Sequence, residues 1–262
     1  MKPERLLTLL SDFGDRDVYV GVMKGVVAQI NSGLTIVDLT HQIPPQNIVA
    51  GRFCLMNAYS YFPEGTVHVA VVDPGVGGAR RAIAVEFAQG FLVGPDNGIF
   101  SGVLSQSPAI SAVELTNADY WRTPQPSKTF HGRDIFAAVG ARLASGTPLQ
   151  WLGREIDCQT LVSLHIRDRQ KTTTGVVGYI QYIDHFGNLV SNIPKSDIQG
   201  QNWCVQVSGL RIPGRETYGD VQMGEAIALV GSHGWVEIAI NGGNANLQLQ
   251  INWEDTVEVI NY

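Results

Sequence analysis

The sequence predicts an α/β protein: an N-terminal α/β domain with a largely parallel sheet between helices, followed by a smaller C-terminal antiparallel β-barrel domain. Across the first two thirds of the 262 residues, short apolar runs alternate with segments whose apolar residues recur at helical spacing. The last third has only short apolar runs separated by turn residues. A polar stretch without an apolar anchor, residues 167–175, lies between the two patterns. We therefore expect domains at residues 1–168 and 176–262, joined by a linker at about 169–175.

The N-terminal part contains the expected helices. Over residues 18–30 an apolar residue falls at every fourth position, which predicts a helix. Asn47 follows two prolines and suits the N-cap of a helix that runs to Tyr61. His131 opens a last helix, whose apolar face reaches Leu143. The strands expected in this part are residues 6–10, 35–39, 67–72, 82–87, 91–93 and 110–115.

The C-terminal part shows no helical pattern. Its expected strands are residues 176–183, 189–193, 203–207, 226–230, 235–240 and 247–251. Short strands with turns between them favour antiparallel pairing into a small barrel. In the N-terminal domain, by contrast, a parallel sheet covered on both faces binds ligands beyond the carboxyl ends of its strands. Asp12 and Asp73 both follow such strands, and we therefore expect the functional site there.

Composition and charge exclude several classes of function. The formal net charge of −6 provides no basic surface for nucleic acid, and no stretch approaches the ~20 apolar residues of a membrane-spanning helix. The apolar run near the N-terminus is too short for a signal sequence. Cys54, Cys158 and Cys204 are widely spaced, which argues against a disulfide framework and favours a reducing compartment. The histidines do not cluster at metal-ligand spacing. We expect a cytoplasmic protein without a metal site that binds neither nucleic acid nor membrane.

Asp73, Arg80 and His131 are the candidate catalytic residues. They lie in the glycine-rich segments Val-Val-Asp73-Pro-Gly-Val-Gly-Gly-Ala-Arg80 and Thr-Phe-His131-Gly-Arg-Asp, each of which follows an apolar run. Glycine lets the backbone approach a ligand closely, and loops on a rigid scaffold often carry the chemistry. Each residue alone is more simply a surface or ion-paired group. An acid, a guanidinium and an imidazole together, with the nearby Asp12 turn, predict a polar site.

A second polar group lies in the C-terminal part. The segment Tyr-Ile-Asp184-His-Phe186-Gly-Asn188 places an acid, an aromatic ring and an amide in a tight turn between two apolar strands. A plain hairpin is the simpler explanation, because Asp, Gly and Asn all favour turns. The same holds for Gly-Ser232-His233-Gly. What favours a binding role is the number of hydrogen-bond donors that these turns bring to one small domain beside a polar site.

Four motifs follow one another along the chain: Ser-Asp12-Phe-Gly with Asp17 and Tyr19 close behind, Asp73-Pro-Gly-Val-Gly with Arg80, Phe-His131-Gly-Arg-Asp, and Asp184-His-Phe-Gly-Asn188. Together they resemble the S-adenosyl-L-methionine hydroxide adenosyltransferase family, whose relatives include the fluorinase and the chlorinase. The resemblance covers nearly the whole chain. It implies the two-domain fold described above, no cofactor, and a homotrimer with the nucleoside at the interface between neighbouring subunits. The implied reaction is displacement of methionine from ribose C5′ by water, which gives adenosine and L-methionine.

The resemblance also implies residues that bind the substrate. They are Asp12 for the ribose hydroxyls, Asp17 for the methionine ammonium, Asp184 and Asn188 for the methionine end, Phe186 packed nearby, and Ser232 on the adenine or the methionine side. A carboxylate suits the ribose because it can accept from both hydroxyls of a cis-diol. Two positions differ from the fluorinase: His233 replaces an arginine, and Gln46 replaces a tryptophan over the ribose.

The implied reaction suits the three candidate catalytic residues. The sulfonium leaves as a neutral thioether and needs no general acid, so the task is to supply an oxygen nucleophile behind C5′. Asp73 can orient the water and take its proton, while Arg80 stays protonated and acts as a fixed charge. His131 is a donor or a base, because an imidazole titrates near neutrality. The sequence leaves open which residue finally accepts the proton.

Two alternative functions stay open at this point. One is a sensor that binds S-adenosyl-L-methionine or adenosine without turnover. The other is a halogenase, which in this superfamily has a tyrosine where this chain has Asp73. A carboxylate at that position repels a halide by several kcal/mol at short range in a partly desolvated pocket. Analysis of the reaction products discriminates between the hydrolase and both alternatives.

Overall fold

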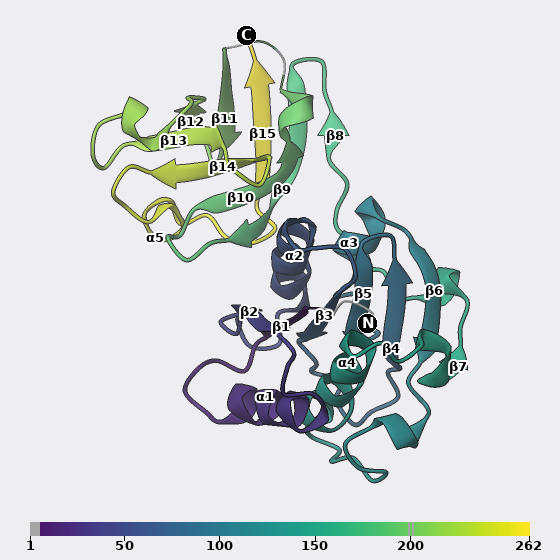
Figure 1. The fold of residues 1–262 in the computed structure, drawn as a ribbon. Helices are drawn as coiled ribbons and strands as arrows, with labels where there is room; N and C mark the ends of the chain where they lie inside the picture. Colours follow the sequence, from purple (N-terminus) through teal and green to yellow (C-terminus); the bar gives the residue numbers. More distant parts are fainter. Residues whose placement is uncertain (1–5, 199, 201) are drawn as a thin grey trace. The chain divides into compact units, whose positions relative to one another are not determined.

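The computed structural model describes residues 6–198, 200 and 202–262, and the chain divides into two compact units (Figure 1). The first unit extends to Leu164 and the second begins at His165. Each unit has its own hydrophobic core. The segment expected as a linker, residues 169–175, includes the short strand β8 (Gln170–Lys171), which pairs with β9 (Gly175–Ile183) of the second unit.

A seven-stranded sheet forms the centre of the first unit. Its strands are β1 (Leu7–Ser11), β2 (Ile36–Thr40), β3 (Thr66–Val71), β4 (Ala82–Phe87), β5 (Gly90–Pro95), β6 (Ala109–Glu114) and β7 (Arg154–Glu155). In the order β2-β1-β3-β5-β4-β6-β7, neighbours are parallel from β2 to β5 and antiparallel from there on. Residues 88–89 alone join β4 to β5, and so short a connection permits only an antiparallel pair. The predicted α/β class is confirmed, as a mixed sheet.

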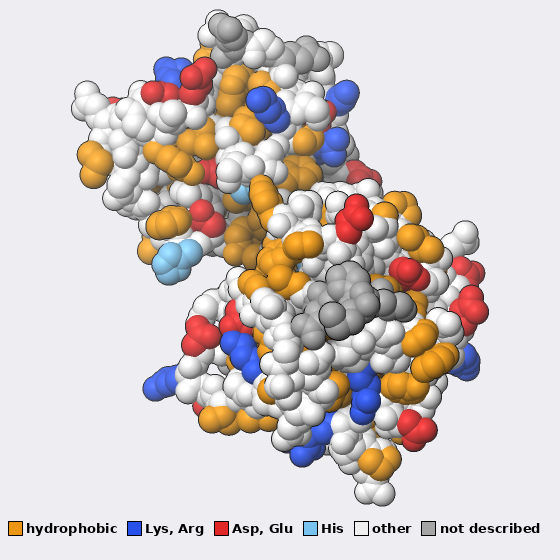
Figure 2. All heavy atoms as spheres, viewed as in Figure 1, with side chains coloured by type: hydrophobic (Ala, Val, Ile, Leu, Met, Phe, Trp, Pro, Cys, Tyr) orange, Lys and Arg blue, Asp and Glu red, His pale blue; other side chains and the backbone are white. Residues whose placement is uncertain are grey.

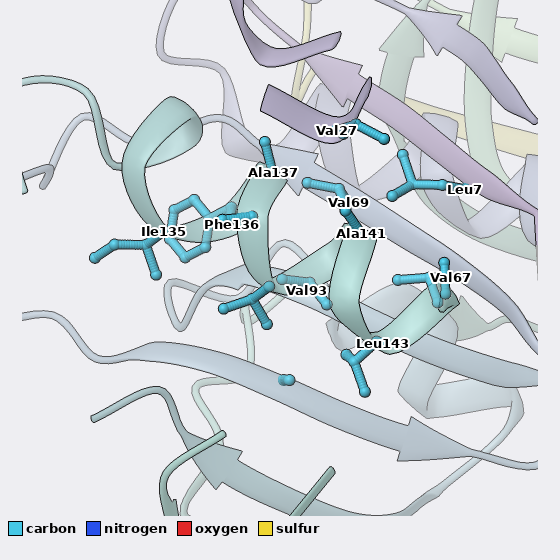
Figure 3. Packing of buried hydrophobic residues seen from close by; sticks show 14 of the residues in the cluster. Leu7, Val27, Val67, Val69, Val93, Ile135, Phe136, Ala137, Ala141 and Leu143 are labelled. Atoms are coloured by element: carbon cyan, nitrogen blue, oxygen red, sulfur yellow. The ribbon is translucent and has the colours of Figure 1, made fainter. Parts of the chain in front are cut away.

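Two helices pack on one face of this sheet. α1 (Tyr19–Ile30) and α4 (Ala137–Ala144) share a core cluster with the apolar side chains of β1 and β3. Figure 3 shows Leu7 and Val69 close to the small residues of α4. A Cβ atom at Gly140 would lie 2.5 Å from a methyl group of Val69, so a larger residue there would push the helix away from the sheet.

Two further helices pack on the other face. In α2 (Ile48–Ala58) the backbone of Gly51 lies against Val72, and α3 (Ser101–Gln106) packs beside α2 (Figure 1). The predicted N-cap of α2 is confirmed, because Asn47 accepts a 2.9 Å hydrogen bond from a first-turn N–H. Because helices cover both faces, the carboxyl ends of the parallel strands are where we look for a ligand site in this unit.

An antiparallel sheet forms a nearly closed barrel in the second unit. Besides β8 and β9, its strands are β10 (Leu189–Pro194), β11 (Trp203–Val207), β12 (Leu210–Pro213), β13 (Ala226–Val230), β14 (Trp235–Ile240) and β15 (Thr256–Asn261). The order is β12-β11-β15-β9-β10-β14-β13. A bridge between Gly214 and Ala228, and a 2.8 Å hydrogen bond from the Arg215 N–H to the Ala228 carbonyl, link the two edges. The predicted C-terminal barrel is confirmed.

The strand expected at residues 247–251 is wrong. This segment overlaps the helix α5 (Ala245–Leu249), which Asn244 caps by accepting the Leu247 N–H at 2.9 Å. Leu247 is 72% exposed whereas Ile251 is buried, so the apolar alternation here does not mark the face of a sheet. Two strands that were not predicted, β12 and β15, complete the barrel in its place.

Charged side chains of both signs are scattered over the visible surface. Lys and Arg side chains are interspersed with Asp and Glu side chains over the face shown in Figure 2, so positive charge is not gathered into one region of that face. Within the described part of the chain, none of the helices has the length and apolar content needed to cross a membrane.

Candidate active site

Arg80 connects the two other predicted catalytic residues. Its Nε–H donates to both carboxylate oxygens of Asp73, at 3.0 and 3.1 Å, and Nη2 donates to Asp73 Oδ2 at 2.5 Å. The same Nη2 lies 2.7 Å from His131 Nδ1. The Asp73 and Arg80 side chains are only 5% and 11% exposed, so salt screens this pair weakly. The structure therefore brings the three residues together in one hydrogen-bonded group.

His131 lies directly before a π-helical turn (Gly132–Phe136), and its contact with Arg80 determines the tautomer of its ring. A guanidinium has donors only, so Nη2 donates and Nδ1 of His131 accepts, which leaves the ring proton on Nε2. Burial lowers the pKa of His131 and the Arg80 charge lowers it further, whereas Asp73 and Asp134 act in the opposite direction. His131 is accordingly neutral at pH 7 and presents Nε2–H as a donor.

Asp12 and Asp73 leave the sheet at the same edge. β1 and β3 are parallel neighbours, and Ser11 pairs with Val71 at their carboxyl ends. Asp12 follows Ser11 directly, and Asp73 is the second residue after Val71. This edge is where open α/β sheets bind their ligands. The structure thus places both carboxylates beyond the carboxyl ends of strands, as the sequence predicts.

Glycine shapes the loop that follows Asp73. Gly77 has φ +75°, and a Cβ atom at this position would lie 2.2 Å from the carbonyl oxygen of Lys128. Only glycine combines this backbone conformation with so close an approach. Because Lys128 lies three residues before His131, the approach keeps the Asp73 loop in contact with the segment that carries the imidazole.

Asp134 anchors the segment that carries His131. Its carboxylate is fully buried and accepts hydrogen bonds of 2.6–3.0 Å from the side chains of Arg133 and Arg122 and from the N–H of Ser127. Burial by itself raises the pKa of Asp134, but these hydrogen bonds outweigh it and lower the pKa to about 2. Asp134 is a positioning group that was not predicted from the sequence, although it belongs to the motif that contains His131.

A buried histidine holds the Asp12 turn and was also not predicted. Ser11 Oγ lies 2.7 Å from Nδ1 of His41, and the His41 carbonyl accepts the Gly14 N–H at 2.8 Å. Asp12 Oδ2 accepts the N–H of Gln46 at 2.8 Å, with Gln46 in the left-handed region at φ +64°. The one signal in the sequence was the position of His41, two residues after the end of an expected strand.

Three aromatic rings join the Asp12 turn to the His131 segment. The ring centroids of Phe13, Tyr19 and Phe130 lie 5.3–5.9 Å apart. A Cβ atom at Gly132 would lie 3.3 Å from the Phe13 ring, so this glycine lets the two segments approach closely. Asp17 is exposed and lies two residues before Tyr19, the first residue of α1. The structure thus brings the Asp12 turn beside the segment that carries His131, with Asp17 at the surface.

In the second unit, Asp184 and Asn188 form one compact turn. Asp184 Oδ1 accepts the N–H groups of Phe186 and Asn188 at 2.9 and 2.8 Å, and its Oδ2 accepts the Asn188 side-chain amide at 2.9 Å. The hairpin role that the sequence suggested for Asp184 is therefore present. A carboxylate offers about four acceptor sites, so three internal bonds leave room for a ligand. Phe186 is 71% exposed at the tip of this turn.

Ser232 lies in a second turn of the same barrel, between β13 and β14. Its side chain is exposed, while the neighbouring His233 is half-buried and bonded to the strand that follows. Among the described residues, no group of three or more His, Cys, Asp or Glu side chains is arranged to hold a metal ion.

The chain is similar to proteins of one family along most of its length. Residues 7–153 match the family described as SAM hydroxide adenosyltransferase N-terminal domain, and residues 178–258 match the corresponding C-terminal domain. An (R)-S-adenosyl-L-methionine hydrolase from Thermus thermophilus is 39% identical over 92% of this chain and 94% of its own. A fluorinase from an Actinoplanes species is 29% identical over 90% and 91%. The crystal structure of an uncharacterized conserved protein from Thermotoga maritima is 33% identical, covers 98% of this chain and 100% of its own, and has a TM-score of 0.92.

Proposed function

Because the chain belongs to the S-adenosyl-L-methionine hydroxide adenosyltransferase family, we propose that it hydrolyses S-adenosyl-L-methionine to adenosine and L-methionine. The observation that carries this proposal is the hydrogen-bonded group of Asp73, Arg80 and His131, in which the Asp73 and Arg80 side chains are almost fully buried. It combines an acceptor for the proton of water, a fixed positive charge and a neutral imidazole donor. The name of the Thermus thermophilus relative supports the same substrate.

Asp73 is the group that accepts the proton of the attacking water. The imidazole of His131 has no acceptor to spare, because Nδ1 accepts from Arg80 and Nε2 carries the ring proton. Asp73 Oδ2 accepts from both Nε and Nη2 of Arg80, whereas Oδ1 accepts only from Nε and keeps a second lone pair for the water. His131 Nε2–H therefore orients the water oxygen while Asp73 takes its proton. Arg80 stays protonated and stabilises the hydroxide character that develops.

The reaction is a single displacement at ribose C5′. A lone pair of the water oxygen forms the bond to C5′ as the C5′–S bond breaks, and the electron pair of that bond stays on sulfur as the neutral thioether of methionine. One proton passes from the water to Asp73 and then to solvent. A sulfonium and a hydroxide-like oxygen both lose charge toward the transition state, so a site with little water favours the step.

The halogenase alternative fits the same site poorly. A halide would need the position that the water occupies, next to the Asp73 carboxylate. Two like charges about 4 Å apart repel by about 4 kcal/mol at an effective dielectric constant near 20. A sensor that binds without turnover would not need a buried acceptor aimed at a water. The similarity to a fluorinase is also the weaker one, at 29% identity against 39%.

Incubation of the purified protein with S-adenosyl-L-methionine and excess chloride or fluoride tests this function. We expect equimolar adenosine and methionine by liquid chromatography and mass spectrometry. A 5′-halo-adenosine would identify a halogenase, and unchanged ligand would identify a sensor. Either of these two results contradicts the proposal.

The substrate is bound by residues of both units, contributed by neighbouring subunits of a homotrimer. Asp12 and Asp17 hold the ribose and the ammonium, while the turns around Asp184 and Ser232 close the methionine and adenine ends. Exposed aromatic and apolar side chains support a subunit interface, among them Phe186 at 71% exposure.

Complementation tests this assembly. Neither Asp73→Ala nor Asp184→Ala protein is active alone, because each lacks half of every site. After dissociation and reassociation of a mixture, some interfaces pair the intact half of each variant, and part of the activity returns. If mixed oligomers verified by mass show no recovery, the complete site lies within one chain.

The proposed compartment is the cytoplasm. Cys54, Cys158 and Cys204 are not joined by disulfide bonds, and the first two are partly accessible to solvent. Accessible cysteines stay out of disulfides where glutathione and thioredoxin keep them reduced.

A further inference from the structure

Glu237 is a buried carboxylate that the mechanism above does not use. It lies on β14, between Val190 of β10 and Leu229 of β13. Its neighbours Val236 and Ile238 belong to the barrel core, so the alternation of a strand places Glu237 on the outer side. It is nevertheless only 3% exposed. Groups on the outside of the barrel therefore cover it.

The cover consists of Tyr218 and of the turn that carries Ser232. Tyr218 Oη donates to Glu237 Oε1 at 2.5 Å, and His233 Nε2 lies 3.0 Å from Glu237 Oε2. His233 Nδ1 accepts the N–H of Trp235 at 3.1 Å, which requires the tautomer with the proton on Nε2. His233 therefore donates to Glu237. The carboxylate thus accepts one side-chain hydrogen bond from each of two surface segments.

This carboxylate lies between the two turns to which substrate contacts are assigned. The 231–234 turn directly precedes β14, and the 184–188 turn leads into β10, whose Val190 pairs with Glu237. Burial raises the pKa of Tyr218, the Glu237 carboxylate raises it further, and Asp184 acts in the same direction. The Tyr218 ring is thus within electrostatic reach of Asp184 as well.

We propose that Glu237 is a positioning residue for substrate recognition, a role that rests on the hydrolysis proposed above. By accepting from His233 and Tyr218, it holds the Ser232 turn and the Tyr218 ring in the orientation that receives S-adenosyl-L-methionine. A short turn of Gly, Ser and His has little packing of its own, so a buried anion at its base restricts its conformations. Glu237 touches neither the substrate nor the reacting atoms, and its loss therefore weakens binding more than it slows the chemical step.

Two variants remove this contact by different routes. Glu237→Met deletes both acceptors, whereas Gly231→Ala keeps them but introduces a Cβ atom 2.3 Å from Glu237 Oε2 and 2.6 Å from His233 Nε2. Glu237→Gln is the conservative variant, because its carbonyl accepts from His233 while its NH₂ group donates to Tyr218 Oη. Glu258→Met, at a half-buried position on β15, is the control for placing methionine on this barrel.

The readout is the division of the effect between KM and kcat. We expect KM for S-adenosyl-L-methionine to rise at least about tenfold in Glu237→Met and Gly231→Ala, with kcat within about threefold of the wild type. Glu237→Gln and Glu258→Met keep both constants within about threefold. Unchanged KM in the two disruptive variants, with folding verified by thermal melts, overturns the proposal. A fall in kcat without a rise in KM overturns it as well.

Nitrogen-15 NMR of the His233 ring separates this role from the hydrolysis itself. If the wild type releases no adenosine, the proposed function fails, but the ring still reports the contact. We expect the Nε2–H tautomer in the wild type, because Nδ1 accepts from Trp235, and a changed Nε2–H chemical shift in Glu237→Met, because the carboxylate that accepts from Nε2–H is lost. The same Nε2–H shift in both proteins would show that Glu237 does not hold the turn.

Discussion

Replacing Asp73 with asparagine separates the chemistry of the site from the stability of the fold. Asparagine has the shape of aspartate but carries no charge, and its NH₂ group cannot accept the proton of a water. Loss of a general base costs about 10²–10⁴ in rate, so we expect kcat to fall by about a thousandfold. Binding of S-adenosyl-L-methionine changes little, because Asp73 contacts the water and not the groups that hold the ligand.

The same change leaves Arg80 without its anion. Removing one partner of a buried ion pair costs about 3–5 kcal/mol, and the slight exposure of Arg80 places the loss at the lower end. A loss of about 3 kcal/mol lowers Tm by roughly 6–12 °C in a unit of this size. Reduced stability alone must therefore be separated from the loss of the base.

Asp96→Asn is the matched control. The Asp96 side chain is 3% exposed and pairs with Arg81 at 2.5 Å, in the same unit but outside the site. We expect a similar fall in Tm with kcat within about twofold of the wild type. The assays are initial rates of adenosine release, calorimetric binding and thermal melts. An Asp73→Asn kcat within tenfold of the wild type, or an equal loss in Asp96→Asn, would refute the assignment of Asp73 as the base.

Four further outcomes are expected. Asp12→Asn weakens binding of S-adenosyl-L-methionine and adenosine alike, because both carry the ribose diol. Asp17→Asn weakens binding of S-adenosyl-L-methionine far more than binding of adenosine, because only S-adenosyl-L-methionine has the ammonium group. Equal losses of affinity for the two ligands, measured by calorimetry, would refute the role of Asp17. Burial lowers the pKa of His68 to about 4 in the folded protein, whereas a histidine in the unfolded chain titrates near 6.5. Because the unfolded chain binds the proton first, we expect the free energy of unfolding to fall as the pH drops from 6.5 toward 4. The expected loss is about 3 kcal/mol and is measured by denaturant unfolding across this pH range. A His68→Gln variant whose unfolding midpoints keep the full pH dependence would refute this role of His68. Asp134→Asn lowers both Tm and kcat, because the segment before His131 loses its anchor; melts and adenosine release check this, and an unchanged kcat contradicts it.

The order of strands and helices was predictable because the residues that face the core recur with the period of the strand or the helix. Residues 82–87, 203–207, 226–230 and 235–240 were predicted with the bounds that the structure has, since each is a continuous or alternating apolar run between turn residues. The antiparallel pairing in half of the first sheet was not predicted, because the sequence of one strand does not show which strand it pairs with. α5 was mistaken for a strand, because a one-turn helix shows too few residues to establish a period.

The residues that carry the chemistry of the candidate site were predictable from the sequence. The residues that hold them in position were not. Asp73, Arg80 and His131 stand out on glycine-rich loops, and the structure brings them into contact. Their supports come from elsewhere in the chain. His41 touches Ser11 across 30 positions, and Glu237 looks like any polar residue on the outer side of a strand. The roles of His41 and Glu237 become clear only from these tertiary contacts, because the local sequence does not show which residues they touch.

Hydrolysis in water enriched in oxygen-18 tests the central claim most directly. If water displaces methionine at C5′, single-turnover adenosine carries one heavy oxygen at its 5′ position, and the released methionine carries none. Tandem mass spectrometry locates the label within the ribose. Unlabelled adenosine, label in methionine, or recovery of unchanged S-adenosyl-L-methionine would contradict displacement by water at C5′.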